Sequence, residues 1–420
     1  MTHTDTEARD SQRLDELRER LKHSGYADYS VEHLCAASRQ FLDYLHERGV
    51  AIEAVQPAQV VMYMRRRLRE YRRSHGRMPQ NRRGWRTWCT DGLVQLLRLV
   101  HPQWPPPRSA RSPAEAHAQT LATDYERWLK DCRGLAKSTI DAGIEETRRF
   151  LAWHIRHYRS EAIRDLSLPQ VHEYMTGRAA GMRRTTIKAV SQKLSAFLRF
   201  LHQCGHTPYD LSGRMIRPTL YEFESIPSIL RPEEIKEILR VTRRDRSARG
   251  RRDYAILTLL ATYGLRAGEI VHLQLQDIDW RAETILIRHS KIRGTTLLPL
   301  VPAAGDALLS YLRSARPKTA AREVFIRMSA PLQGFSRGNA LHALVRRRIA
   351  AAGVRPVGKR GPHVFRHAHA VGLLRATVPM KTISDLLGHR SSRSTAIYLK
   401  LDSEELRAVA LPLPSAEGAR

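Results

Sequence analysis

The stretch "YGLRAGEIVHL" (263–273) continues an apolar run, "DYAILTLLATYG" (253–264), and together they decide the fold of the last part of the chain. The apolar run predicts a buried helix that ends at Gly264, because glycine readily adopts the left-handed conformation that closes helices. Arg266 then stands at the start of a new helix, where backbone N–H groups also point toward any bound anion. Glu269 follows one turn later and is expected to pair with Arg266 and hold its guanidinium plane.

The neighbouring segments predict a mixture of helices and a small sheet. Upstream, "LRPEEIKEILRVT" (230–242) begins a helix at Pro232, with two glutamates in the first turn where the helix dipole favours them. Downstream, "ETILIRH" (283–289) and "TTLLPL" (295–300) are short β-rich runs joined by "SKIRG" (290–294). This pattern predicts a hairpin with Lys291 at its exposed tip.

Two later stretches carry basic and hydroxyl-bearing side chains. "HVFRHAHAVGLL" (363–374) places His363 and Arg366 three positions apart, hence on one face of a helix, with Val364, Ala368 and Val371 as a buried stripe. "LLGHRSSRSTAIYL" (386–399) places His389 just past a helix-ending glycine and Tyr398 on the helix that follows.

Two arginines, a lysine, two histidines and a tyrosine form a plausible set for phosphoryl transfer without a metal ion. Arginine forks bind the non-bridging oxygens of a phosphodiester in a bidentate manner and neutralise charge in the transition state. Tyrosine can attack phosphorus to form a covalent phosphotyrosine. A lysine or histidine then has to protonate the departing sugar oxygen.

Each of these residues, taken alone, could also have a purely structural role. A lone helical tyrosine is usually part of a core, and a lone Arg-x-x-Glu is usually a surface ion pair. His363, His367 and His369 could indicate metal ligands, but the carboxylate or cysteine partners expected of such a site are missing. We therefore predict no metal and no cofactor. His367 is expected to support the catalytic residues without contacting the phosphate itself, and His369 is expected to pack its helix against the core.

The order and spacing of these motifs resemble the catalytic domain of tyrosine recombinases, the phage integrase family, over about residues 229–410. "ATYGLRAGEIVHLQLQDID" (261–279) is similar to the first motif of that family, and "HVFRHAHA" resembles its H-x-x-R-H motif. "LLGHRSSRSTAIYLK" (386–400) resembles the L-G-H motif, in which the nucleophilic tyrosine comes nine residues after the histidine. Lys291 precedes Pro299 by eight residues, as the hairpin lysine of the family precedes its "PL".

The resemblance implies a role for each matching position. Tyr398 would be the nucleophile that forms a 3′-phosphotyrosyl link, Arg266 and Arg366 the phosphate clamp, and Lys291 the general acid for the 5′-hydroxyl. His363 would assist proton transfer in both directions, while His389 would hydrogen-bond and position the phosphate. The energy of the broken bond is kept in the phosphotyrosine, so neither ATP nor a metal is implied.

Composition agrees with a nucleic-acid partner. The 420 residues include 71 Lys and Arg against 42 Asp and Glu, a formal charge of +29 that is spread along the chain. Such an excess predicts a polyanionic partner, here double-stranded DNA. The N-terminus lacks the apolar core of a signal peptide, and the longest apolar run is too short to span a bilayer. We expect a cytoplasmic, nucleoid-associated protein with no membrane partner.

Two irregular stretches, 101–113 and 210–229, divide the chain. The predicted domains are an N-terminal helical DNA-binding domain (1–105), a helical core-binding domain (114–212), the catalytic domain (229–411) and a tail (412–420). Residues 38–64 can be laid on 147–175, and "LLRLVH" (96–101) on "FLRFLH" (197–202), which suggests a duplicated domain. Chance similarity between amphipathic helices remains an alternative.

The predicted fold is mainly α with a small β-sheet: helical core-binding (SAM-like) domains followed by an α+β tyrosine-recombinase catalytic domain. The resemblance implies site-specific DNA cleavage and rejoining by a homotetramer, or a hetero-assembly with related recombinases, on paired sites. The C-terminal segment (401–415) would pack on a neighbouring subunit. Two alternatives stay open: an inactive DNA-binding accessory factor and a type IB topoisomerase-like enzyme. Cys35, Cys89, Cys132 and Cys204 form no CxxC pair and are expected to be buried thiols.

Overall fold

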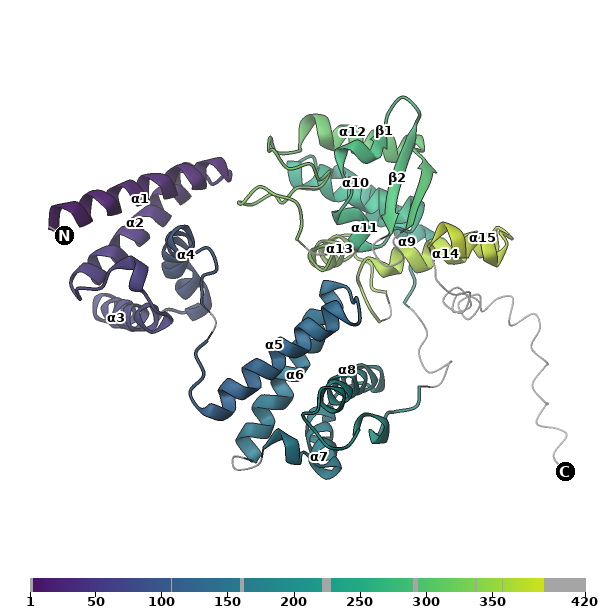
Figure 1. Cartoon of the computed structure of the whole chain (residues 1–420). Coiled ribbons are helices and arrows are strands. Elements are labelled where there is room, and N and C mark those ends of the chain that lie inside the picture. Colours follow the sequence, from purple (N-terminus) through teal and green to yellow (C-terminus); the bar gives the residue numbers. More distant parts are fainter. Residues whose placement is uncertain are drawn as a thin grey trace. The chain divides into compact units, whose positions relative to one another are not determined.

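The computed structural model describes residues 3–106, 108–158, 162–220, 228–289, 294–336, 338–356 and 358–388 (Figure 1). Lys291, His389, Tyr398 and the C-terminal segment from 401 onward lie outside the described residues. The chain divides into two compact units, one formed by residues 1–105 together with 226–420 and the other by residues 106–225. None of the described helices is long and apolar enough to cross a membrane.

The first four helices form a bundle that we call the first bundle. It contains α1 (His3–His23), α2 (Asp28–His46), a 3-10 turn (Ile52–Ala54), α3 (Pro57–His75) and α4 (Arg82–Val100). Apolar residues recur at helical spacing on each inward face, and Leu17, Phe41 and Leu93 are completely buried in the shared core. Trp104 also packs on this core, so the chain stays attached to the bundle beyond the end of α4.

The next four helices, the second bundle, repeat the same order of elements. They are α5 (Pro113–Asp131), α6 (Lys137–His157), a 3-10 turn (Ile163–Asp165), α7 (Leu168–Ala179) and α8 (Arg184–Gln203). The third helix of each bundle begins in the same way, with a proline in its first turn. In each, a glutamine side chain reaches back to the capping N–H: Gln59 to Gln56 and Gln170 to Ser167.

The residues that the sequence comparison pairs occupy equivalent places in the two cores. Phe41 meets Tyr63 edge-on with ring centroids 5.1 Å apart, and Phe150 meets Tyr174 edge-on at the same separation. Met64 and Met175 follow these tyrosines and are both buried. The two bundles therefore share not only an element order but also a specific aromatic contact at their centre.

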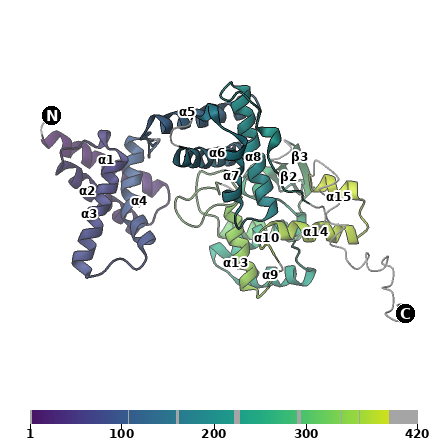
Figure 2. The same ribbon diagram turned by 90° about the horizontal axis from the view of Figure 1, so that it is seen from below.

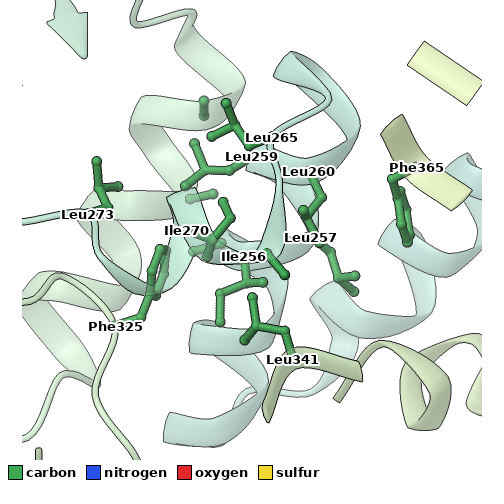
Figure 3. Packing of buried hydrophobic residues seen from close by; sticks show 14 of the residues in the cluster. Ile256, Leu257, Leu259, Leu260, Leu265, Ile270, Leu273, Phe325, Leu341 and Phe365 are labelled. Atoms are coloured by element: carbon green, nitrogen blue, oxygen red, sulfur yellow. The ribbon is translucent and has the colours of Figure 1, made fainter. Parts of the chain in front are cut away.

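The C-terminal part begins with α9 (Pro232–Arg244), α10 (Ala248–Tyr263) and the short α11 (Ala267–Val271). It continues after the sheet with α12 (Pro302–Ser314), α13 (Ala340–Ala351), α14 (His363–Arg375) and α15 (Met380–Leu386). The central helix is α10, which packs against α9, α12 and α14. Figure 2 shows α9 and α14 next to α10. The apolar residues of α10, including Leu257 and Leu260, gather with Ile270, Phe325 and Phe365 in one core (Figure 3).

The sheet has three antiparallel strands in the order β1 (Ile278–Asp279), β2 (Thr284–His289) and β3 (Gly294–Pro299). Thr284 pairs with Pro299 and His289 with Gly294, which confirms the predicted pairing of the two β-rich runs. Ile285 and Ile287 point into the core, while Tyr263 at the end of α10 donates its hydroxyl to the carbonyl of Pro299 at 2.8 Å. The fold class is thus mainly α with a small sheet, as predicted.

The prediction of four buried thiols is wrong for two of the cysteines. Cys35 and Cys89 are buried in the first bundle, but Cys132 and Cys204 are exposed. The exposed pair stands at the C-terminal ends of α5 and α8, where the chain leaves the bundle core. Helix spacing alone does not show that a residue one position past a helix has turned away from the core.

Candidate active site

Arg266 is held at the start of α11 by a local capping interaction. Gly264 ends α10 in the left-handed conformation, with φ of 62°, and the chain then enters α11 at Arg266. Glu269 accepts both the backbone N–H and the Nη1–H of Arg266, each at 2.8 Å. The predicted pair is therefore present, and it fixes the guanidinium plane because the same carboxylate binds the backbone and the side chain.

A histidine that the sequence motifs did not single out completes this pair. His289, the last residue of β2, is buried and its Nδ1 lies 2.7 Å from Oε1 of Glu269. Its Nε2 lies 2.8 Å from the hydroxyl of Thr296 on β3. The available signal was the alternation of "TILIRH", which puts His289 on the same inward face as Ile285 and Ile287.

The carboxyl group of Glu269 is ionised in this setting. Its burial acts to raise the pKa, but hydrogen bonds from His289 and from the backbone and side chain of Arg266 outweigh that effect. The pKa of Glu269 therefore lies below its ordinary value. The charged carboxylate forms an ion pair with the partly buried guanidinium of Arg266.

Arg366 reaches the same place from α14. It is buried, and its guanidinium donates to the carbonyl of Gly264 at 2.9 Å and to the carbonyl of Leu387. The next carbonyl along the chain, that of Gly388, accepts the Nη2–H of Arg266 at 2.8 Å. Two arginines from separate motifs are thus bound to consecutive carbonyls.

Close packing at two glycines makes this convergence possible. A Cβ added to Gly264 would lie 2.9 Å from the ring of His369 and 3.2 Å from Leu387. Gly388 has a φ of 58°, and a Cβ there would lie 3.1 Å from the ring of His289. At both positions the absence of a side chain lets the segment before residue 389 approach α10, α14 and β2.

The histidines of α14 occupy different surroundings. His363 is exposed at the first turn, whereas Arg366, predicted on the same face, is buried one turn later. The ring of His367 lies near that of His363, with centroids 6.2 Å apart. Burial, with smaller effects from His363, Arg366 and Lys359, lowers the pKa of His367 to about 4. Burial also lowers the pKa of His369, so both inner rings are neutral near pH 7.

The structure therefore brings together Arg266, Glu269 and Arg366 of the predicted set, with His363 and His367 on the same helix as Arg366. Lys291, His389 and Tyr398 fall outside the described residues. His389 directly follows Gly388, whose carbonyl binds Arg266, and Lys291 comes two positions after His289. Across the described ranges, no group of three or more His, Cys, Asp or Glu side chains is arranged to hold a metal ion.

Comparison with solved structures supports the fold. The chain is similar to a lambda integrase dimer bound to a COC′ core site, with a TM-score of 0.53 and 16% identity over 67% of this chain and 94% of that one. Relatives found by sequence share a higher percentage of identical residues with this chain. The putative integrase/recombinase y4gC of Sinorhizobium fredii (strain NBRC 101917 / NGR234) is 57% identical over 46% of this chain and 98% of its own length.

A second relative extends further along the chain. The putative integrase/recombinase y4rA of the same strain is 34% identical over 72% of each protein. Residues 228–405 match the model of the phage integrase family. The chain belongs to the phage integrase family, the tyrosine recombinases. This membership supports a function in DNA recombination.

Proposed function

We propose that the chain is a site-specific DNA recombinase that cleaves and rejoins duplex DNA through a 3′-phosphotyrosine on Tyr398. One observation carries this proposal: Arg266 and Arg366 converge on the carbonyls of Gly388 and Leu387, directly before His389. The motif carrying the tyrosine thus begins at the point where the two arginines meet.

Two guanidinium groups at one place favour an anionic ligand. Arg266 is oriented by the ionised carboxylate of Glu269, and Arg366 reaches the same backbone segment from α14. A phosphodiester presents the negative charge and the oxygen geometry that guanidinium forks match.

The residues of the set account for each step of the exchange. The hydroxyl oxygen of Tyr398 attacks phosphorus, a new O–P bond forms, and the bond between phosphorus and the 5′-oxygen breaks. Lys291 donates the proton that the departing 5′-oxygen needs, and His363 exchanges protons with the reacting oxygens. Arg266, Arg366 and His389 stabilise the charge on the phosphoryl oxygens.

Rejoining is the reverse of this step with a different 5′-hydroxyl as the attacking group. The covalent link conserves the energy of the broken bond, so the reaction needs neither ATP nor a metal ion. Exchange between two duplexes requires four active tyrosines, and we propose a homotetramer on paired sites, with residues 401–415 packing on a neighbouring subunit.

The test uses nicked suicide substrates built from the DNA that flanks the gene. Loss of a short 5′-fragment traps the covalent intermediate, and a denaturing gel detects the protein–DNA adduct. The wild-type chain should form the adduct and Tyr398→Phe should not, although it should bind the DNA equally well. Arg266→Ala should lower the cleavage rate by at least about 10², as loss of a transition-state donor does.

Arg313→Ala is a matched control, because Arg313 is an exposed arginine on α12 away from the site. An adduct that persists in Tyr398→Phe would contradict the role of Tyr398. Tight, salt-sensitive binding without any adduct in the wild type would indicate an accessory DNA-binding factor. Relaxation of supercoiled DNA without recombinant products would indicate the topoisomerase-like alternative.

A further inference from the structure

The two bundles differ most in length between their third and fourth helices. Tyr63 and Leu96 of the first bundle are 33 positions apart, whereas their counterparts Tyr174 and Phe197 are 23 positions apart. Most of the difference extends the third helix, because α3 has 19 residues and α7 has 12. Between these matched core positions of the third and fourth helices, the first bundle therefore has ten residues more than the second.

The additional residues add little to the core. Residues 69–83 are all described, and Pro79 alone among them is buried. This segment, which we call the basic hairpin, comprises the end of α3, the connecting turn and the start of α4. The second bundle closes its core with a shorter third helix and a shorter connection, so the additional length is not a requirement of this arrangement of helices.

What the basic hairpin adds instead is positive charge. It exposes six arginines and contains one acidic residue, Glu70. Glu70 pairs with Arg66 and Arg67 on the preceding turn of α3. Among the described residues, none of the six has an acidic side chain within ion-pair distance; they are Arg69, Arg72, Arg73, Arg77, Arg82 and Arg83.

The basic hairpin is held in one shape. Tyr71 on α3 meets Trp85 on α4 edge-on, with ring centroids 5.8 Å apart, and stacks on His75 at 4.1 Å. Asn81 caps α4 by accepting the N–H of Gly84 at 2.8 Å. The arginines on both sides of the turn are therefore presented by a preorganised frame, which reduces the entropy lost when they bind a ligand.

We propose that the basic hairpin is a binding surface for the phosphates of duplex DNA, made of residues other than the catalytic set. Six clustered guanidinium groups repel one another, and a polyanion removes that repulsion. The nearby rings of Tyr71, His75 and Trp85 contact one another, whereas the six guanidinium groups are exposed, which favours contacts with backbone phosphates over base stacking. This surface requires no cleavage, so it goes beyond the proposed catalytic function.

The test compares two double variants of the full chain in a Tyr398→Phe background, so that binding is measured without cleavage. Arg73→Gln/Arg77→Gln changes the basic hairpin. Arg20→Gln/Arg39→Gln removes the same charge from exposed positions on α1 and α2 of the same bundle. Fluorescence anisotropy with a duplex of about 60 base pairs, roughly 200 Å at 3.4 Å per pair, gives the affinity over a range of salt concentrations.

The logarithm of the affinity falls linearly with the logarithm of the salt concentration, with a slope of about 0.9 per phosphate contact. The hairpin variant should lower the magnitude of that slope by about 2, one contact for each arginine, while the control variant keeps the slope of the parent. Equal slopes for both double variants would overturn the proposal. A loss confined to single-stranded DNA or RNA of the same length would overturn it as well.

The outcome does not depend on the catalytic assignment. Arg266→Ala, which should fail in cleavage, should retain the hairpin-dependent part of the slope. Conversely, the difference in salt slope can be measured, and the proposal tested, even if the chain forms no covalent adduct in any assay. Thermal unfolding of both double variants should match the parent, because exposed arginines without partners contribute little to stability.

Discussion

The two bundles place similar aromatic residues at their centres, but the arginines of their third helices differ in where they lie. In the second bundle, Arg178 on α7 turns inward and binds the buried carboxylate of Glu146 on α6, with Nε 3.0 Å from Oε1. Tyr174 donates its hydroxyl to the same carboxylate. The first bundle has Ala37 at the position that matches Glu146, and its α3 directs arginines to the surface.

This difference separates the features that both bundles share, which the fold requires, from the features that occur in only one bundle, which the fold does not require. The aromatic contact and the capping glutamine occur in both bundles, so they belong to the shared frame. The pair of Glu146 with Arg178 and the basic hairpin occur in one bundle each, so neither is a requirement of the frame. Experiments can test each side of this division.

The largest expected effect is on the shared frame. Phe41→Ala and Phe150→Ala each remove a fully buried ring from an equivalent contact, and each should cost about 3–5 kcal/mol of stability. Hydrogen–deuterium exchange of the full chain should show faster exchange only in the bundle that carries the change. Loosening of both bundles by either substitution would show that they do not fold separately.

A smaller loss should follow when the internal pair of the second bundle is broken. Arg178→Met leaves the buried carboxylate of Glu146 with only the longer, 3.6 Å contact to Arg149 as an ion pair and should cost about 2–3 kcal/mol. The matched position in the first bundle is Arg67, which pairs with the partly exposed Glu70. Arg67→Met should cost less than about 1 kcal/mol in denaturant unfolding, and equal losses would mean that the two arginines have the same role.

The smallest expected effect is a pH dependence of the second bundle. Burial acts to raise the pKa of Glu146, but hydrogen bonds from Arg178 and Tyr174 outweigh it, so the pKa lies below the ordinary value of 4.5. The folded state then binds a proton less readily than the unfolded state. The stabilisation is complete above the ordinary pKa and is lost as the pH falls through the folded pKa.

Acidification below about pH 4.5 should therefore lower the protection of the α6 amides of the wild type, measured as the intrinsic exchange rate at each pH divided by the observed rate. Glu146→Gln is the control, because it removes the titrating group while keeping a similar shape. The difference in exchange between the two proteins should shrink as the pH falls. A difference that stays constant from neutral to acidic pH would contradict an ionised, paired Glu146.

Local rules predicted the framework of the candidate site correctly. The end of α10 at Gly264, the start of α11 at Arg266 and the pairing of Arg266 with Glu269 all involve residues within one or two turns. The antiparallel pairing of β2 and β3 depends on a short connection between two β-rich runs. In these cases the spacing along the chain determines which groups can meet.

Contacts between distant positions were not predictable from spacing. His289 meets Glu269 across 20 positions, and the carbonyl of Gly388 meets Arg266 across 122. The acceptors on residues 387 and 388 are backbone atoms, which every residue possesses, so no motif reveals them. The unequal exposure of His363 and Arg366 likewise depends on the packing of α14 and not on their spacing.

The use of main-chain carbonyls as acceptors determines how the site responds to mutation. Truncating Leu387 to alanine removes packing but leaves its carbonyl in place, so an alanine scan of this segment would report stability and miss the arginine contacts. The vulnerable property is the path of the backbone. At Gly388, a side chain would both meet the ring of His289 and disfavour the left-handed conformation, and the acceptors would move without any polar side chain being lost.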